Sequence, residues 1–114
     1  MTRLACFKAY DIRGRVGDEL TEELATRISA AFVAATGASS IVVGHDCRAS
    51  SPALAAAITE GALLAGADVS DIGQCGTEEV YFATDHLEAG GGLMITASHN
   101  PISDNGIKLI GVGA

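Results

Sequence analysis

Segments with the apolar spacing of a helix alternate along this chain with short apolar runs typical of strands. From residue 20 to 35, apolar residues recur every three or four positions, which predicts a helix. Residues 40–44 form a short β-branched run, as expected of a strand buried on both faces. Because the alternation continues to residue 111, the chain is expected to fold in the α/β class.

Three helices are predicted. The first has Thr21 as its N-cap and Gly37 as its stop, and the second has Ser51 as its N-cap, Pro52 as its first residue and an end near Gly66. The third covers residues 78–86. The expected buried face of the first helix consists of Leu20, Leu24, Ile28, Ala31, Phe32 and Ala35, and that of the second of Leu54, Ile58, Ala62 and Ala65.

The predicted strands are a short one within residues 7–17 that runs into a loop, residues 40–44, a strand with Val69 and Ile72 that ends at Gly73, and residues 93–97. A last strand, residues 106–111, is expected to pair antiparallel with residues 93–97. The resulting fold is a mostly parallel mixed sheet with one antiparallel strand and helices on both faces.

Length and composition restrict the class further. At 114 residues and 48% hydrophobic content, the chain fits one globular domain. Its net charge of −7 argues against a nucleic acid or a membrane surface as partner. Three scattered cysteines predict free thiols, buried or partly buried, without a disulfide or zinc site. With neither a signal peptide nor an apolar stretch of roughly 18 residues, we expect a cytoplasmic location.

Three polar loops are predicted at the carboxyl ends of strands, where ligands of open α/β sheets bind: Tyr10–Gly14, His45–Ser50 and Ser98–Asn105. The helix that begins near Pro52 adds N–H groups suited to an anion. In the third loop, an exposed Ser98 could present its oxygen to a substrate, and His99 could move a proton. From the residues alone, a serine that caps a turn is the favoured interpretation of Ser98.

Four motifs in order cover nearly the whole chain: KAYDIRG at residues 8–14, GHDCRAS at 44–50, GTEEVYFAT at 76–84, and TASHNP at 96–101 followed by DNGIK at 104–108. Together they resemble the α-D-phosphohexomutase family, most closely its bacterial phosphomannomutases. The third motif is similar to a segment of the phosphomannomutases that feed GDP-mannose synthesis. One departure is His45, where the family commonly has arginine, which puts a structural salt bridge in doubt.

The resemblance implies a role for each matching residue. Ser98 would carry the phosphoryl group and, through its phosphate, ligate Mg²⁺. Lys108 would act as general acid or base at the sugar hydroxyl, His99 would assist proton transfer, and Arg13 would contact the phosphoserine. The residues that would shape the site or bind phosphate are Tyr10, Asp11, Asn100, Asp46 and Arg48.

These roles agree with the chemistry, since a phosphoserine carries about −1.5 to −2 charge and needs cations around it. Without the resemblance, a solvated strand lysine is the favoured interpretation of Lys108, whereas Arg13 could equally be a surface arginine and Arg48 could equally form an ion pair with Asp46.

The resemblance also implies that residues 1–114 are the N-terminal domain of a four-domain enzyme, whose other domains are its partners. The chain has no DGDxDR run, and its abrupt end after Gly111 suggests a truncation. The substrate would be a phosphosugar and the activator a hexose 1,6-bisphosphate. Because Ser98 alone offers Mg²⁺ too few ligands, we expect the fragment to be inactive by itself.

Three alternatives remain open at this stage. Two are enzymes of the same family, a phosphoglucomutase and a phosphoglucosamine mutase, since later domains mainly set sugar specificity. The third is a stand-alone binding module in which Ser98 serves as a phospho-switch.

Overall fold

The computed structural model describes residues 7–17, 20–96 and 104–112. Strands and helices alternate along them as the sequence predicts. The elements are β1 (Phe7–Arg15), α1 (Glu22–Thr36), β2 (Ser40–His45), α2 (Ser51–Leu64), β3 (Asp68–Gln74), α3 (Thr77–His86), β4 (Gly91–Ile95) and β5 (Asp104–Val112).

The strands form a five-stranded sheet in the order β1-β5-β4-β2-β3. Strand β2 pairs in parallel with β3 and with β4, whereas β5 runs antiparallel to both of its neighbours, β4 and β1. The predicted mostly parallel sheet with one antiparallel strand is therefore confirmed.

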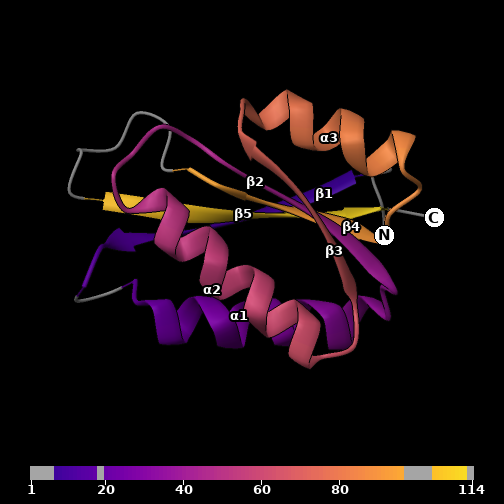
Figure 1. Cartoon of the computed structure of the whole chain (residues 1–114), viewed down its shortest axis with the longest axis horizontal. Coiled ribbons are helices and arrows are strands. Elements are labelled where there is room, and N and C mark those ends of the chain that lie inside the picture. The colour runs from indigo at the N-terminus through magenta and orange to yellow at the C-terminus, as the bar shows by residue number, and fades with distance from the viewer. Residues whose placement is uncertain (1–6, 18–19, 97–103, 113–114) are drawn as a thin grey trace.

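Helices cover both faces of the sheet, as predicted: α1 and α2 lie on one face and α3 on the other (Figure 1). This arrangement follows from the direction of each crossover. The connections through α1 and α2 run toward β3, whereas the connection through α3 runs back from β3 to β4. If every crossover is right-handed, a reversal of direction places the helix on the opposite face.

Two hydrophobic clusters lie on the two faces of the sheet. The larger one includes Ile41, Leu93 and Ile107 and packs against α1 and α2. The smaller one includes Val42 and Met94 and packs against α3. Since adjacent residues of a strand point to opposite faces, strands covered on both sides are apolar at consecutive positions.

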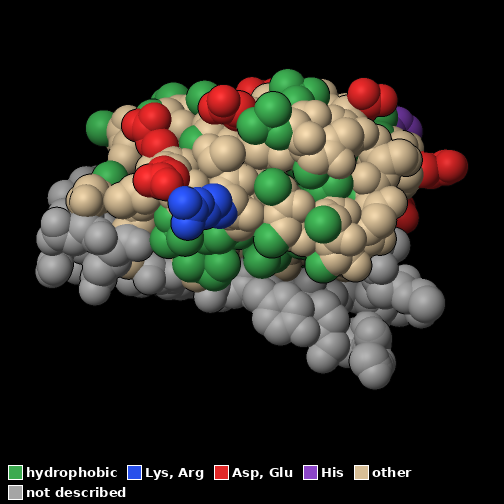
Figure 2. Space-filling view, turned by 90° about the horizontal axis from the view of Figure 1, so that it is seen from below, with side chains coloured by type: hydrophobic (Ala, Val, Ile, Leu, Met, Phe, Trp, Pro, Cys, Tyr) green, Lys and Arg blue, Asp and Glu red, His purple; other side chains and the backbone are tan. Residues whose placement is uncertain are grey.

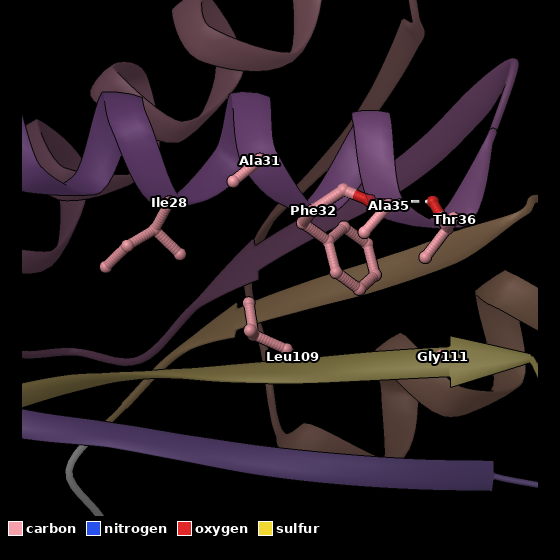
Figure 3. Close-up of a pocket in the computed structure, with 7 residues that line it drawn as sticks. All are labelled: Ile28, Ala31, Phe32, Ala35, Thr36, Leu109 and Gly111. Carbon is pink, nitrogen blue, oxygen red and sulfur yellow. Dashed lines mark hydrogen bonds between the residues drawn. The ribbon is translucent and has the colours of Figure 1, made fainter.

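The buried face of α1 differs in part from the predicted one: Leu20 is buried as expected and Ile28 and Phe32 pack against the core, but Ala31 and Ala35 are exposed. The fully buried residues are Ala25, Ser29 and Val33, while Leu24 is 37% exposed. The most apolar side of the helix instead lines a groove of about 420 Å³ against β5 (Figure 3). The groove is lined by Ile28, Ala31, Phe32, Ala35, Thr36, Leu109 and Gly111. Only small residues allow α1 to approach α2 closely. The packing of the two helices therefore determines which face of α1 is buried, rather than the spacing of its apolar residues.

Capping was predicted well for α1 and less well for α2. Thr21 accepts a hydrogen bond from the Leu24 N–H at 3.1 Å, and Gly37 ends the helix with a φ of 68°, as expected. The N-cap of α2 is Ser50 rather than Ser51, and the helix ends at Leu64. Ala65 comes after that last turn and is exposed, so it does not belong to the buried face.

Strand boundaries also need correction. The segment Tyr10–Gly14, predicted as a loop, lies inside the nine-residue strand β1, because pairing with β5 extends along the whole segment. Strand β4 begins two residues before the predicted one and ends at Ile95. Strand β5 begins at Asp104, which shortens the predicted loop Ser98–Asn105.

On the face seen in Figure 2, acidic side chains lie apart from one another, and basic side chains form one small area. Apolar side chains are dispersed over the same face. Among the described residues, no helix has the length and hydropathy needed to cross a membrane. Cys47 is exposed, contrary to the prediction, and Cys75 is partly buried.

Candidate active site

The ends of three strands meet at one edge of the sheet. The carboxyl ends of β2 and β4 are joined there by a hydrogen bond from the Asp46 N–H to the Ile95 carbonyl, 2.9 Å long. The last residues of β1 pair with the first residues of β5, Arg15 opposite Asp104. In open α/β sheets this edge binds ligands, particularly where adjacent strands lead to opposite faces.

Asp46 and Arg48 form a partly buried ion pair just beyond β2. Arg48 Nε donates to Asp46 Oδ2 at 3.3 Å, and the Arg48 N–H donates to Asp46 Oδ1 at 3.0 Å. The Arg48 side chain is 9% exposed, and its Nη1 donates to the Asp104 carbonyl at 3.1 Å. The pair thus links the loop after β2 to the start of β5.

The Asp46 carboxyl is held in its charged form. Burial by itself would raise the pKa of Asp46, but hydrogen bonds from Ser51, the Arg48 N–H and Thr96, together with the Arg48 charge, lower that pKa below its ordinary value of 3.8. Asp46 and Arg48 thus hold each other in place, and the shaping role expected of both stays a prediction.

Two residues that the sequence analysis did not include among the site residues complete this cluster. Ser51 donates from Oγ to Asp46 Oδ1. Asn105, which is fully buried, donates from Nδ2 to Ser50 Oγ at 2.8 Å and to Ser51 Oγ at 2.9 Å. We call the closed set of contacts the Asp46 ring; its members are Asp46, Arg48, Ser51, Asn105 and Asp104.

The ring occupies part of the region where an anion site was expected at the start of α2. The Ser51 N–H already donates to the Arg48 carbonyl at 3.0 Å, so this N–H group is not free for an anion. A cavity of about 310 Å³ lies on the other side of Ser50, between α2 and the start of α1. The residues that line it are Val16, Gly17, Leu20, Thr21, Glu22, Ser50, Ala53 and Leu54.

Ser98, His99 and Asn100 lie outside the described residues. The described chain brackets them closely, since it stops at Thr96 and resumes at Asp104. Thr96 donates its N–H to the Gly106 carbonyl at 2.9 Å. The two described residues that flank segment 97–103 both contact the Asp46 ring: the Thr96 side chain hydrogen-bonds to Asp46, and the Asp104 carbonyl accepts from Arg48.

The remaining candidates lie on two neighbouring strands. In the register of β1 with β5, Arg13 lies opposite Gly106 and Asp11 opposite Lys108; Tyr10 pairs with Leu109. Lys108 is half-buried and also pairs with Met94 of β4. Backbone pairing thus brings two candidates from the first motif, Asp11 and Arg13, alongside the segment DNGIK, and Tyr10 alongside the residue that follows it, although about 95 residues separate the paired positions in the chain.

His45 is the one departure from the resembled family that the sequence analysis named. In place of the arginine side chain common in the resembled family, His45 Nδ1 lies 2.9 Å from the Asp46 carbonyl.

The described part of the chain contains no group of three or more His, Cys, Asp or Glu residues that could hold a metal ion. These residues alone therefore do not provide the oxygen ligand set that Mg²⁺ requires.

The low pKa of Asp46 predicts a pH-dependent effect of Asp46→Asn. A carboxyl whose pKa is lower in the folded state stabilises the fold above its unfolded value, near 3.8, and loses this contribution as pH falls through its folded pKa. We expect Asp46→Asn to lower the free energy of unfolding by about 1–2 kcal/mol at pH 7 and by progressively less below pH 3.8.

Urea denaturation between pH 7 and pH 2.5 measures this difference. Asp68→Asn, which removes an exposed carboxylate at the start of β3, corrects for the loss of one negative charge. A deficit for Asp46→Asn that stays constant across this range would contradict a stabilising charged Asp46.

Comparison with known proteins identifies the family. The sequence model described as "Phosphoglucomutase/phosphomannomutase, alpha/beta/alpha domain I" matches residues 5–114. The chain belongs to this family. Domain I is also the part of the family's proteins in which the sequence analysis placed the chain.

Individual members of the phosphoglucomutase/phosphomannomutase family are also similar to this chain in sequence. The chain is 59% identical over 107 residues to "Phosphohexose mutases" of Xanthomonas campestris, covering 94% of this chain and 24% of that protein. It is 54% identical to a phosphomannomutase of Salmonella typhimurium, covering all of this chain and 25% of the relative. The chain thus spans about a quarter of the length of these two relatives.

A solved structure supports the fold. A phosphoglucomutase/phosphomannomutase family protein from Burkholderia thailandensis superimposes with a TM-score of 0.82 at 38% identity. The match covers 94% of this chain and 26% of that one.

Proposed function

We propose that this chain is the phosphoserine-bearing N-terminal domain of a phosphomannomutase that interconverts mannose 6-phosphate and mannose 1-phosphate. The observation that carries the proposal is the 54% identity to a named phosphomannomutase along the full length of the chain. The Asp46 ring supports it, because this ring lies at both ends of the segment that contains Ser98.

The proposed reaction has two phosphoryl transfers. In the first, the bond between phosphorus and the Ser98 oxygen breaks as a sugar hydroxyl bonds to phosphorus, which gives a hexose bisphosphate. The hydroxyl proton passes to a general base, for which we propose Lys108, with assistance from His99. In the second, the other phosphate of the bisphosphate transfers to Ser98, and the general acid returns the proton.

Charge neutralisation is the other requirement of the reaction. Arg13 would contact the phosphoserine, and its backbone in β1 pairs with Gly106 near the beginning of β5. Mg²⁺, when bound, would offset the negative charge of the transferred group. Apart from the Ser98 phosphate, its ligands would come from the other domains of the parent, since the described residues do not supply a set.

A second candidate substrate is glucose 1-phosphate. The family description names phosphoglucomutase beside phosphomannomutase, and the Xanthomonas relative is described by the broader name "Phosphohexose mutases". The full-length protein could therefore convert both sugars.

The test is a coupled assay with each purified sugar phosphate, performed on the full-length protein and on residues 1–114. We expect turnover of mannose 1-phosphate by the full-length protein and none by the fragment, since this chain is about a quarter as long as its mutase relatives. A full-length protein that converts neither sugar phosphate would rule out the proposed function.

A further inference from the structure

Both polar atoms of the Asn105 side chain are hydrogen-bonded at the Asp46 ring. Asn105 is 0% exposed, and its Nδ2 group donates to two hydroxyl oxygens, those of Ser50 and Ser51. Its Oδ1 accepts from the Gly106 N–H at 2.8 Å. The Gly106 N–H can only donate, so it fixes the amide orientation and directs Nδ2 toward the start of α2.

The contacts around Asn105 specify an amide rather than a carboxylate. The Ser51 hydroxyl donates its proton to Asp46 Oδ1, so its remaining capacity is to accept a hydrogen bond. Asn105 Nδ2 supplies that hydrogen bond at 2.9 Å. A carboxylate at position 105 would compete for the Ser51 proton and add a second negative charge near Asp46.

The position of Asn105 in the chain connects this network to segment 97–103. Asn105 is the second residue after the segment, and the Asp104 carbonyl before it accepts a hydrogen bond from Arg48. At the other end of the segment, the Thr96 side chain hydrogen-bonds to Asp46. The two flanking residues, Thr96 and Asp104, are therefore bonded to the same ion pair, and Asn105 also joins the start of β5 to the start of α2.

We propose that Asn105 is a positioning residue for phosphoryl transfer, which couples the first turn of α2 to the segment that carries Ser98. This inference rests on the proposed function. Its basis is that a transferred group must be aligned closely, since a displacement of about 1 Å can lower a rate on the order of a hundredfold. Asn105 acts through the Asp46 ring and does not itself contact the reacting atoms.

The test compares Asn105→Ala, Ser51→Ala and the double variant in the full-length protein. We expect each single variant to lower kcat about 10- to 100-fold, with KM changed by less than about threefold, because alignment and not substrate binding is lost. Since either change opens the same ring, the double variant should be within about threefold of the slower single variant.

Ser29→Ala is the matched control. Ser29 is also fully buried and donates to the Ile58 carbonyl at 2.6 Å, but it joins α1 to α2 outside the ring. Its kcat should stay within about twofold of wild type. The inference is wrong if kcat of Asn105→Ala equals that of Ser29→Ala, or if the two single effects multiply. Ser51→Ala carries the test if Asn105→Ala does not fold.

Hydrogen exchange in this chain separates the inference from the proposed function. We expect amides of residues 97–103 to exchange at least about tenfold faster in Asn105→Ala than in Ser29→Ala. Equal rates, including rates already at the unprotected limit in wild type, would overturn the coupling. A full-length protein without mutase activity but with this difference in exchange would reject only the proposed function.

Discussion

Replacement of Ser98 by alanine in the full-length protein is expected to lower the mutase rate on the order of a thousandfold or more. The proposed mechanism passes every phosphoryl group through the Ser98 oxygen, and alanine has no oxygen to accept it. Loss of a covalent carrier typically removes most of an enzyme's rate enhancement. Substrate binding to other parts of the site should persist.

The measurements are kcat from the coupled assay and intact mass of the purified protein. Wild type should carry a mass increment of one phosphate, which Ser98→Ala should lack. Ser70→Ala, at an exposed position of β3, is the matched serine control and should retain both activity and phosphate. If Ser98→Ala keeps more than about a tenth of the wild-type rate, Ser98 is not the carrier.

The same variant distinguishes the enzyme from a phospho-switch module. A module would carry phosphate on Ser98 without any turnover of sugar phosphate, and Ser98→Ala would then change only its binding. Turnover lost together with phosphate, in contrast, connects the modification to the reaction.

Local signals in the sequence predicted both ends of α1 correctly and those of α2 less well. Thr21 and Gly37 limit α1 because capping depends on neighbouring residues, here the Leu24 N–H and a left-handed backbone at Gly37. The order of strands and helices followed from apolar spacing in the same way. The antiparallel pairing of the last strand with β4 was also predicted, whereas the order of the strands in the sheet was not.

Predictions that depended on distant partners were less accurate. Residues Tyr10–Gly14 have the polar and glycine content of a loop, yet β5 pairs with all of them from about 95 positions later in the chain. The Asp46–Arg48 pair could be predicted, since the two residues are two positions apart. The bond from Asn105 to Ser51 could not, because 54 positions separate them and neither residue carries a charge.

Packing between α1 and α2 explains the error in the buried face of α1 and leads to the second prediction. The helices are joined by hydrogen bonds from Thr26 Oγ1 to the Ala57 carbonyl, 3.2 Å, and from Ser29 Oγ to the Ile58 carbonyl, 2.6 Å. Hydroxyls reach carbonyls of another helix only when the two backbones are unusually close. Gly61 provides this closeness on the side of α2.

A Cβ atom at Gly61 would overlap the Thr26 carbonyl oxygen and lie 3.1 Å from Ser29 Cβ. The oxygen belongs to the α1 backbone and cannot rotate away, so the helices would have to separate. At an exposed helix position, alanine is about 1 kcal/mol more favourable than glycine. At Gly61 the overlap should outweigh that gain, because overpacking a close contact costs about 1–3 kcal/mol or more and separation weakens both hydrogen bonds.

We therefore expect Gly61→Ala to lower the free energy of unfolding by about 2–3 kcal/mol, measured by urea denaturation, and the melting temperature by about 10 °C. Ala56→Gly, at an exposed position of the same helix, measures helix propensity alone and should be less stable than wild type by about 1 kcal/mol. Because propensity and packing predict opposite signs at Gly61, the sign alone decides between them. A Gly61→Ala variant more stable than wild type by the roughly 1 kcal/mol that helix propensity predicts would mean that α1 and α2 can separate without loss, and that the close contact does not determine which face of α1 is buried.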